Sequence, residues 1–249
     1  FDEKKAAAYP EAEEIFHRAG ENFEEVYTFL SKDENPNRKK LLFSLALKDA
    51  KDLKASVLED HLDCEQGDLP EEIFRKDLLC PRIFLEELTP YRSVIRGFFE
   101  EETKHSFAEQ PERILDYLKK NITFHAEEEY DTIMATPVGV LTMKQGSPLA
   151  QKILFVAICR SLNVAARLNP VTLEPEYYHN GAFHSVETEA AVLKEETESA
   201  VLTLNAEDGS AWKYYQTWTI GKWNGTVFET LNYEETAFNG KTLALTLEP

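Results

Sequence analysis

Seven consecutive apolar residues at 153–159 stand out in the hydrophobic pattern of the chain. The run is too short to span a membrane and too apolar on all sides for a surface helix, so it predicts one fully buried segment. Ser147 and Pro148 precede it as a helix start, because a serine hydroxyl can cap free N–H groups and proline is tolerated in the first turn. We therefore predict a buried helix at 148–162.

Helical spacing of apolar residues recurs through the first half of the chain. It predicts an amphipathic helix over about 12–30 and further short helices up to about 120, interrupted by prolines. Beyond the buried helix, β-favouring residues predict strands near 164–168 and 182–187, and Asn180-Gly181 is a typical hairpin turn. The predicted helix packs against these strands.

The pattern changes again after a Glu-rich linker at 188–198. Alternating segments separated by Asp208-Gly209, Asn224-Gly225 and Asn239-Gly240 turns predict strands at 201–204, 212–220, 226–231 and 243–247. The fold class is therefore α+β. We expect three parts, namely a helical N-terminal region at 1–108, a core of a buried helix on antiparallel strands at 109–187, and a β-rich module at 188–249 that is small for a β-sandwich.

The stretch ILFVAICRSLNVAARLNP, at 153–170, resembles the transglutaminase-like branch of the papain-like superfamily. In that family the core helix ends in an arginine, here Arg160, followed by a turn and a strand that begins GIPAR, here 163–167. Three flanking stretches resemble a subgroup of such proteins from gut bacteria, namely PRIFLEELTPYR, TPVGVLTMK and WKYYQTWTIGKWNG. The resemblance implies a papain-like core, and since further strands follow in the subgroup, we expect this chain to end within its β-module.

The resemblance also implies a chemistry. A cysteine at the start of the core helix, made a thiolate by the helix dipole and a histidine, would attack a carbonyl and form an acyl-enzyme. The cysteine position, twelve residues before the arginine, holds Pro148, and the histidine position of the HAWxEV pattern holds Gly181. The cysteines present are Cys64, Cys80 and Cys159. We therefore predict that both catalytic positions are degenerate and that the protein is a pseudoenzyme.

A binding module for peptide or cell-envelope glycan is the preferred interpretation, with a cleft between the core helix and the hairpin. The candidate cleft residues are Ser147, Gln151, Tyr177, Tyr178, His179, Phe183 and His184. One alternative is an active cysteine- or serine-type amidohydrolase or acyltransferase with a displaced nucleophile. Another is a structural scaffold. A cleft without a Cys, Ser or Thr near a histidine would exclude the active enzyme.

Two arginines and a tyrosine in PRIFLEELTPYR permit two interpretations. Arg82, Tyr91 and Arg92 could hold an acidic group or a sugar at the surface. They could also be buried anchors that tie their helix to its neighbours, and this second interpretation is favoured.

Charge and composition exclude several classes of partner. The net charge of −18 argues against nucleic acid and anionic membrane surfaces, because both need clustered Lys and Arg. No run of 18 apolar residues is present, so no transmembrane segment is expected. The spacing of the three cysteines matches no zinc or disulfide framework, so we expect free thiols. We also expect neither a metal nor a cofactor. The cytoplasm is modestly favoured, unless a signal peptide before Phe1 has been removed.

Overall fold

The computed structural model describes residues 2–124, 135–186, 200–205, 212–214, 216–223, 228–230 and 241–247. The chain forms two compact units, Phe1–Val192 and Leu193–Pro249. The first unit combines helices with a three-stranded antiparallel sheet, and the second contains short antiparallel strand pairs. The predicted α+β class is confirmed.

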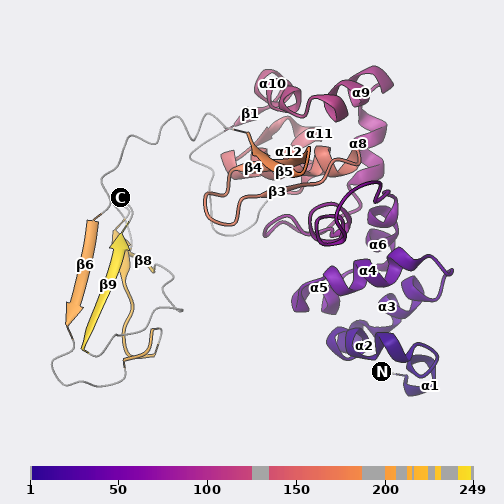
Figure 1. The fold of residues 1–249 in the computed structure, drawn as a ribbon, viewed down its shortest axis with the longest axis horizontal. Helices are drawn as coiled ribbons and strands as arrows, with labels where there is room; N and C mark the ends of the chain where they lie inside the picture. Colours follow the sequence, from indigo (N-terminus) through magenta and orange to yellow (C-terminus); the bar gives the residue numbers. More distant parts are fainter. Residues whose placement is uncertain are drawn as a thin grey trace. The chain divides into compact units, whose positions relative to one another are not determined.

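Helices build the N-terminal part of the first unit (Figure 1). The predicted helix over 12–30 is wrong in its continuity, because Gly20 adopts a φ of 58° and breaks it into two helices joined by a short 3-10 turn. The elements are α1 (Glu3–Ala6), η1 (Pro10–Ala12), α2 (Glu13–Ala19), η2 (Gly20–Asn22), α3 (Phe23–Leu30), α4 (Pro36–Ser44), α5 (Leu47–Asp52), α6 (Ala55–Leu62), α7 (Glu71–Ile73) and the π-helix η3 (Phe74–Leu79).

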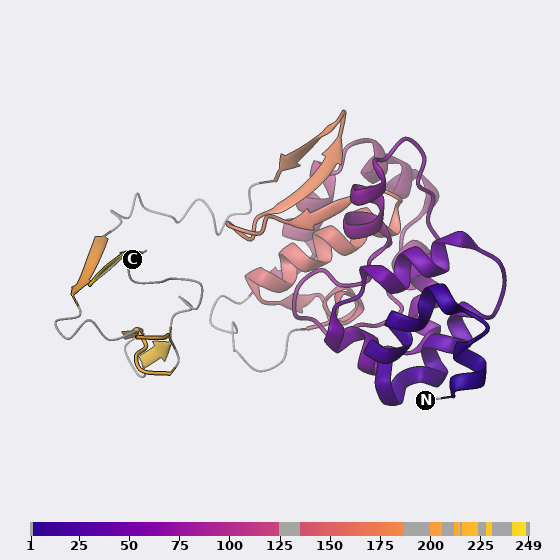
Figure 2. The ribbon, with the colours of Figure 1, turned by 60° about the horizontal axis from the view of Figure 1, so that its bottom comes forward.

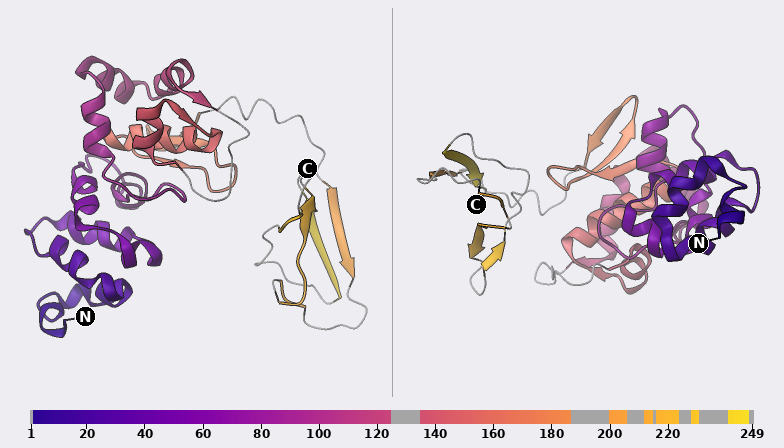
Figure 3. Two further views of the ribbon diagram at one scale, coloured as in Figure 1. Left: turned by 180° about the vertical axis from the view of Figure 1, so that it is seen from behind. Right: turned by 90° about the horizontal axis from the view of Figure 1, so that it is seen from below.

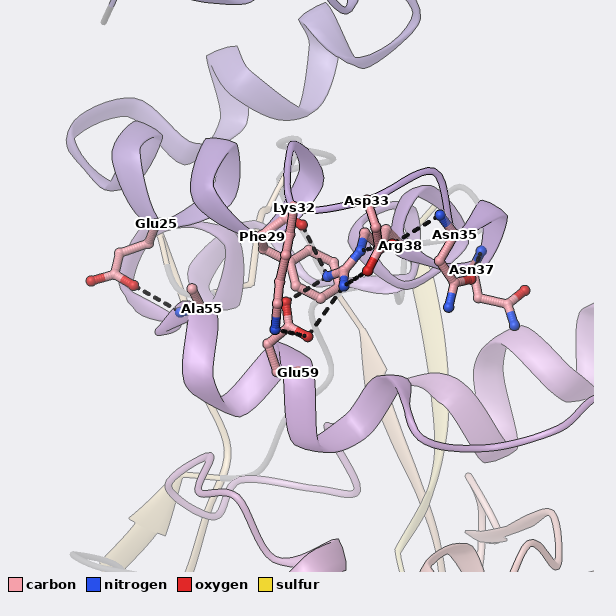
Figure 4. A network of polar contacts seen from close by, with 9 residues as sticks. All are labelled: Glu25, Phe29, Lys32, Asp33, Asn35, Asn37, Arg38, Ala55 and Glu59. Atoms are coloured by element: carbon pink, nitrogen blue, oxygen red, sulfur yellow. Dashed lines mark hydrogen bonds and ion pairs between the residues drawn. The ribbon is translucent and has the colours of Figure 1, made fainter.

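A polar network fastens α3, α4 and α6 to one another (Figure 4). The Arg38 guanidinium lies over the Phe29 ring and forms ion pairs with Asp33 at 2.7 Å and Glu59 at 2.6 Å. Hydrogen bonds from Arg38 lower the pKa of Asp33. Because the Arg38 side chain is buried, these pairs fix the helices around an apolar cluster that includes Phe16.

The second half of the first unit surrounds the predicted buried helix, which the structure confirms as α12 (Pro148–Ser161). Its residues and those of its neighbours form a second apolar cluster. The elements around it are α8 (Arg92–Phe98), α9 (Glu101–Glu109), α10 (Glu112–Asn121), β1 (Thr123–Phe124), α11 (Pro137–Met143), β2 (Gln145–Gly146), β3 (Ala166–Leu168), β4 (Pro175–His179) and β5 (Ala182–Ser185).

The sheet has the strand order β3-β4-β5 and is antiparallel throughout. Figure 2 shows its orange strands beside the salmon helix α12, which contacts β3 and β4. Asn180 and Gly181 have φ values of 50° and 83°, which fit the predicted hairpin turn between β4 and β5. The helix thus packs on the first two strands, while β5 forms the far edge of the sheet.

Two buried arginines join the N-terminal cluster to the cluster around α12. Arg92 donates to the backbone oxygens of Leu78 and Arg160, and Arg160 donates to those of Cys80 and Arg82. Arg92 is fully buried and Tyr91 nearly so, at 0% and 1% exposure. For these two residues the interpretation as buried anchors is therefore confirmed.

The C-terminal unit contains two antiparallel strand pairs among its described residues, β6 (Ala200–Asn205) with β9 (Thr242–Leu247) and β7 (Gly221–Trp223) with β8 (Phe228–Thr230). The first pair is visible in Figure 3. The predicted strand at 212–220 is wrong, because Gln216 and Thr217 form a turn in which both N–H groups donate to the Lys213 oxygen. The predicted linker at 188–198 and the three Asx-Gly turns lie outside the described residues.

A helix that crosses a membrane must be both long and apolar. Within the described ranges, none is both long and apolar enough to cross a membrane.

Candidate functional site

The start of α12 is where the family resemblance places a nucleophile. The Ser147 hydroxyl accepts a hydrogen bond from the Ala150 N–H at 3.1 Å, so it caps the helix, and Pro148 occupies the first turn. Gln151, one turn further on, is buried. The segment therefore begins a helix as predicted, and the Ser147 hydroxyl is used to cap it.

Cys159 lies in the last turns of the same helix and is fully buried, at 0% exposure. Burial raises the pKa of its thiol well above the ordinary value, and the neighbouring Arg160 only partly offsets this effect. A protonated thiol without solvent access is neither a nucleophile nor a metal ligand. Burial in the core therefore makes the Cys159 thiol unreactive.

We expect Cys159 to resist alkylation in the native protein. Iodoacetamide without denaturant should label it far more slowly than the partly exposed Cys64, because the reagent needs both access and a thiolate. Peptide mapping by mass spectrometry measures both rates. Comparable labelling of the two thiols in the folded state would contradict the assignment.

An ion pair lies beside the first turns of α12. The Lys152 ammonium contacts the Glu174 carboxylate at 2.8 Å, with 12% and 14% of the two side chains exposed. Glu174 ends the loop between β3 and β4, so this loop lies near the start of the helix. No motif in the sequence predicts this pair, although Lys152 lies four residues after Pro148, on the same helix face.

Gly181 lies near the end of α12, far from the helix start where Pro148 stands. Strand β4 runs from the loop near the start of α12, and its Tyr178 N–H donates to the Ala165 oxygen, just beyond the end of the helix. Gly181 lies two residues beyond His179, where β4 ends. A helix of 14 residues is about 21 Å long, so Pro148 and Gly181 do not share one cleft.

One face of the hairpin carries a phenol and two imidazoles, and a carboxylate from α10 meets it. The Tyr177 hydroxyl donates to the Glu112 carboxylate at the start of α10, and the Tyr177 ring stacks on His184 with 5.6 Å between centroids. The bond lowers the pKa of Glu112, while burial and this carboxylate raise the pKa of Tyr177 to about 12. His184 Nε2 lies 3.0 Å from the His179 backbone oxygen.

The other face of the hairpin is aromatic and cationic. Phe183 packs edge-on against Tyr178, and the Arg167 guanidinium lies 3.6 Å from the centre of the Phe183 ring. Arg167 also pairs with Glu176 at 3.0 Å. Both Tyr178 and Phe183 are partly exposed. This face offers ring edges and charged groups to a ligand.

The structure thus divides the candidate cleft residues into two groups. It brings together the five on the hairpin, namely Tyr177, Tyr178, His179, Phe183 and His184. It separates them from Ser147 and Gln151 on α12, and no hydrogen bond among the described residues joins Ser147 to either hairpin histidine. Side chains of α12 fill the interface between the helix and the sheet. Among the described residues, no serine, threonine or cysteine side chain forms a hydrogen bond with the imidazole of either hairpin histidine.

Comparison with known families agrees with this architecture. The family model of the transglutaminase-like superfamily matches residues 92–212, which include α8 to α12, the sheet and the beginning of the second unit. This part of the chain is therefore similar to the domain that the transglutaminase-like superfamily shares. Neither the comparison with curated proteins nor the comparison with solved structures gave a match.

Proposed function

We propose that the transglutaminase-like domain is catalytically silent and serves as a binding module for peptides or cell-envelope glycans. The observation that carries the proposal is the start of α12, where Pro148 stands at the position of the nucleophile and the Ser147 hydroxyl is engaged as a helix cap. Acyl transfer by the papain-like route needs a thiolate and a nearby base. The hairpin at 175–185 supplies aromatic and imidazole groups for binding, and Arg167 on the adjacent strand β3 supplies a guanidinium.

We expect no transamidation by the purified protein. Incorporation of a fluorescent amine into a glutamine-containing substrate should stay at the level of buffer, because no covalent step is available. The Pro148→Cys variant should also stay at this level, because its thiol would stand at the start of α12, whereas His179 and His184 lie on the strands beside the turn at the other end of this helix. Turnover by the unmodified chain that Ser147→Ala or His179→Ala abolishes would establish a displaced nucleophile instead.

We expect the binding role to depend on the hairpin. A panel of peptides and glycans that raises the melting temperature of the wild-type protein should lose this effect in Phe183→Ala, which removes the ring under Arg167. His105→Ala is the control, because this exposed residue lies on α9. Stabilisation that persists in Phe183→Ala would place the ligand elsewhere.

A further inference from the structure

A second surface lies in the N-terminal helices, outside the residues that match the transglutaminase-like superfamily. Residues from α4, α7 and η3 line a groove of about 790 Å³, a volume in the range of protein ligand sites. The groove is open to solvent, which suits a segment bound at the surface better than an enclosed small molecule. Its lining residues are Pro36, Lys39, Lys40, Phe43, Glu71, Glu72 and Arg75.

The charges of this groove differ from those of the chain as a whole. Three of its residues are cationic and two are anionic, in a chain with a net charge of −18. Lys40 pairs with Glu71 at 2.9 Å, and Glu72 pairs with Lys76 at 2.7 Å, so both groove carboxylates are already engaged. Lys39 has a distant partner, Glu11 at 3.9 Å. The remaining charge available to a ligand is therefore positive.

Arg75 is the residue in this groove whose hydrogen-bond donors are open to a ligand. Its guanidinium forms no hydrogen bond or ion pair with any described residue, and it acts on Glu72 only through space, adding to the lowering of the Glu72 pKa that Lys76 dominates. An arginine can bind a carboxylate through two parallel hydrogen bonds. Arg75 also lies on the π-helix η3, in which the Cys80 N–H donates to the Arg75 oxygen, and such turns are frequent at functional sites.

Apolar surface adjoins these cations. Phe43 is partly exposed and Pro36 is exposed, and the Lys40 ammonium lies over the ring of the buried Phe74, at 5.5 Å from its centre. The stems of the lysines add further methylene groups to the walls. A partner that suits this surface therefore combines carboxylates with an apolar or aromatic side chain.

We propose that the groove lined by Phe43 and Arg75 binds an acidic, extended peptide segment of a partner protein, with a carboxylate on Arg75 and an apolar side chain against Phe43. The Arg38 network holds α4, which lines the groove, against α3 and α6, so the surface is formed before the partner arrives. Since the opposed charges are exposed to solvent, binding weakens as salt is added.

Fluorescence anisotropy with the full chain tests this assignment. The probe is a labelled decapeptide of alternating Glu and Phe, and its matched control replaces every Glu by Gln. We expect the acidic peptide to bind at least tenfold more tightly than the Gln peptide, and Arg75→Glu and Phe43→Ala each to weaken it at least tenfold. Lys48→Glu carries the same charge change on an exposed residue of α5 outside the groove and should bind as the wild type does.

The remaining outcomes overturn the proposal. These are no detectable binding of the acidic peptide, equal binding of its Gln analogue, and equal weakening by Lys48→Glu and Arg75→Glu. An oligomer of galacturonic acid, added as a competitor, tests an acidic glycan as the occupant, and tighter binding of this oligomer than of the peptide would replace the peptide by a glycan. Far-UV circular dichroism of each variant confirms that it is folded. If the groove proposal fails, the proposed binding role of the hairpin still stands, because the ligand panel with Phe183→Ala tests it separately.

Discussion

Replacing Arg160 by Met is expected to lower the free energy of unfolding by about 3–5 kcal/mol. The side chain is buried, and its guanidinium donates to the backbone oxygens of Ala166 at 2.8 Å, Cys80 at 2.7 Å and Arg82 at 2.9 Å. Methionine replaces the stem but donates no hydrogen bond, so these three carbonyls, and the more distant Lys76 oxygen at 3.5 Å, lose this donor. Each unsatisfied buried group costs about 1–3 kcal/mol.

Urea unfolding followed by circular dichroism measures this loss. Arg113→Met is the matched control, because Arg113 is exposed on α10 and, among the described residues, its side chain donates only to the Ser106 hydroxyl. Surface changes of this kind stay within about 0.5 kcal/mol. A loss below about 1 kcal/mol in Arg160→Met would mean that its carbonyl partners find other donors, and that this arginine does not hold the two apolar clusters together.

The sequence predicted the central helix correctly because each of its signals is local. The apolar run at 153–159 fills the core, Ser147 caps the first turn, and Asn163 has a φ of 64° at the exit. The Asn180-Gly181 turn was equally clear, since only a few residue types accept positive φ. Helix limits were predicted less accurately. At Gly20 the positive φ ends one helix, but the spacing of apolar residues in the sequence continues across it and gives no sign of the break.

The candidate site was harder to predict because it depends on contacts between distant parts of the chain. Pattern matching placed Pro148 and Gly181 as a pair, but the antiparallel course of β3 and β4 carries Gly181 to the far end of the sheet. The pair beside the helix start, Lys152 and Glu174, joins residues that no motif connects. Glu112 reaches Tyr177 across 65 positions of sequence, and only the packing of α10 against α12 and the sheet brings them together.

The stability of the protein is expected to fall steeply as the pH is lowered from 7 to 5, and His61 accounts for this loss. His61 is fully buried, its Nδ1 accepts from Arg92 Nε at 3.3 Å, and its Nε2 lies 3.4 Å from the Thr89 oxygen. Burial, and then the positive charges of Arg92, Arg160 and Arg96, hold its pKa well below the usual range. The folded state therefore keeps the imidazole neutral where the unfolded chain, with a pKa of about 6.5, takes up a proton.

Because the unfolded state binds the additional proton, the contribution of His61 is complete above pH 6.5 and is lost as the pH falls below it. The loss is about 1.4 kcal/mol per pH unit for one proton, or about 2 kcal/mol between pH 6.5 and 5. Carboxylates with lowered pKa values, such as Glu59, contribute at still lower pH. Asp77, whose pKa is raised by burial, acts in the opposite direction, so the effect of His61 must be measured as a difference between variants.

Urea midpoints of the wild type, His61→Gln and His105→Gln at a series of pH values provide this difference. Glutamine can accept from Arg92 and donate to the Thr89 oxygen but does not titrate, so His61→Gln should be less stable at pH 7 and should show a flatter pH dependence down to pH 5. His105→Gln changes an exposed histidine on α9 and should follow the wild type. If His61→Gln keeps the slope of the wild type, the imidazole is already protonated in the folded state, and Arg92 must then face a cation at 3.3 Å.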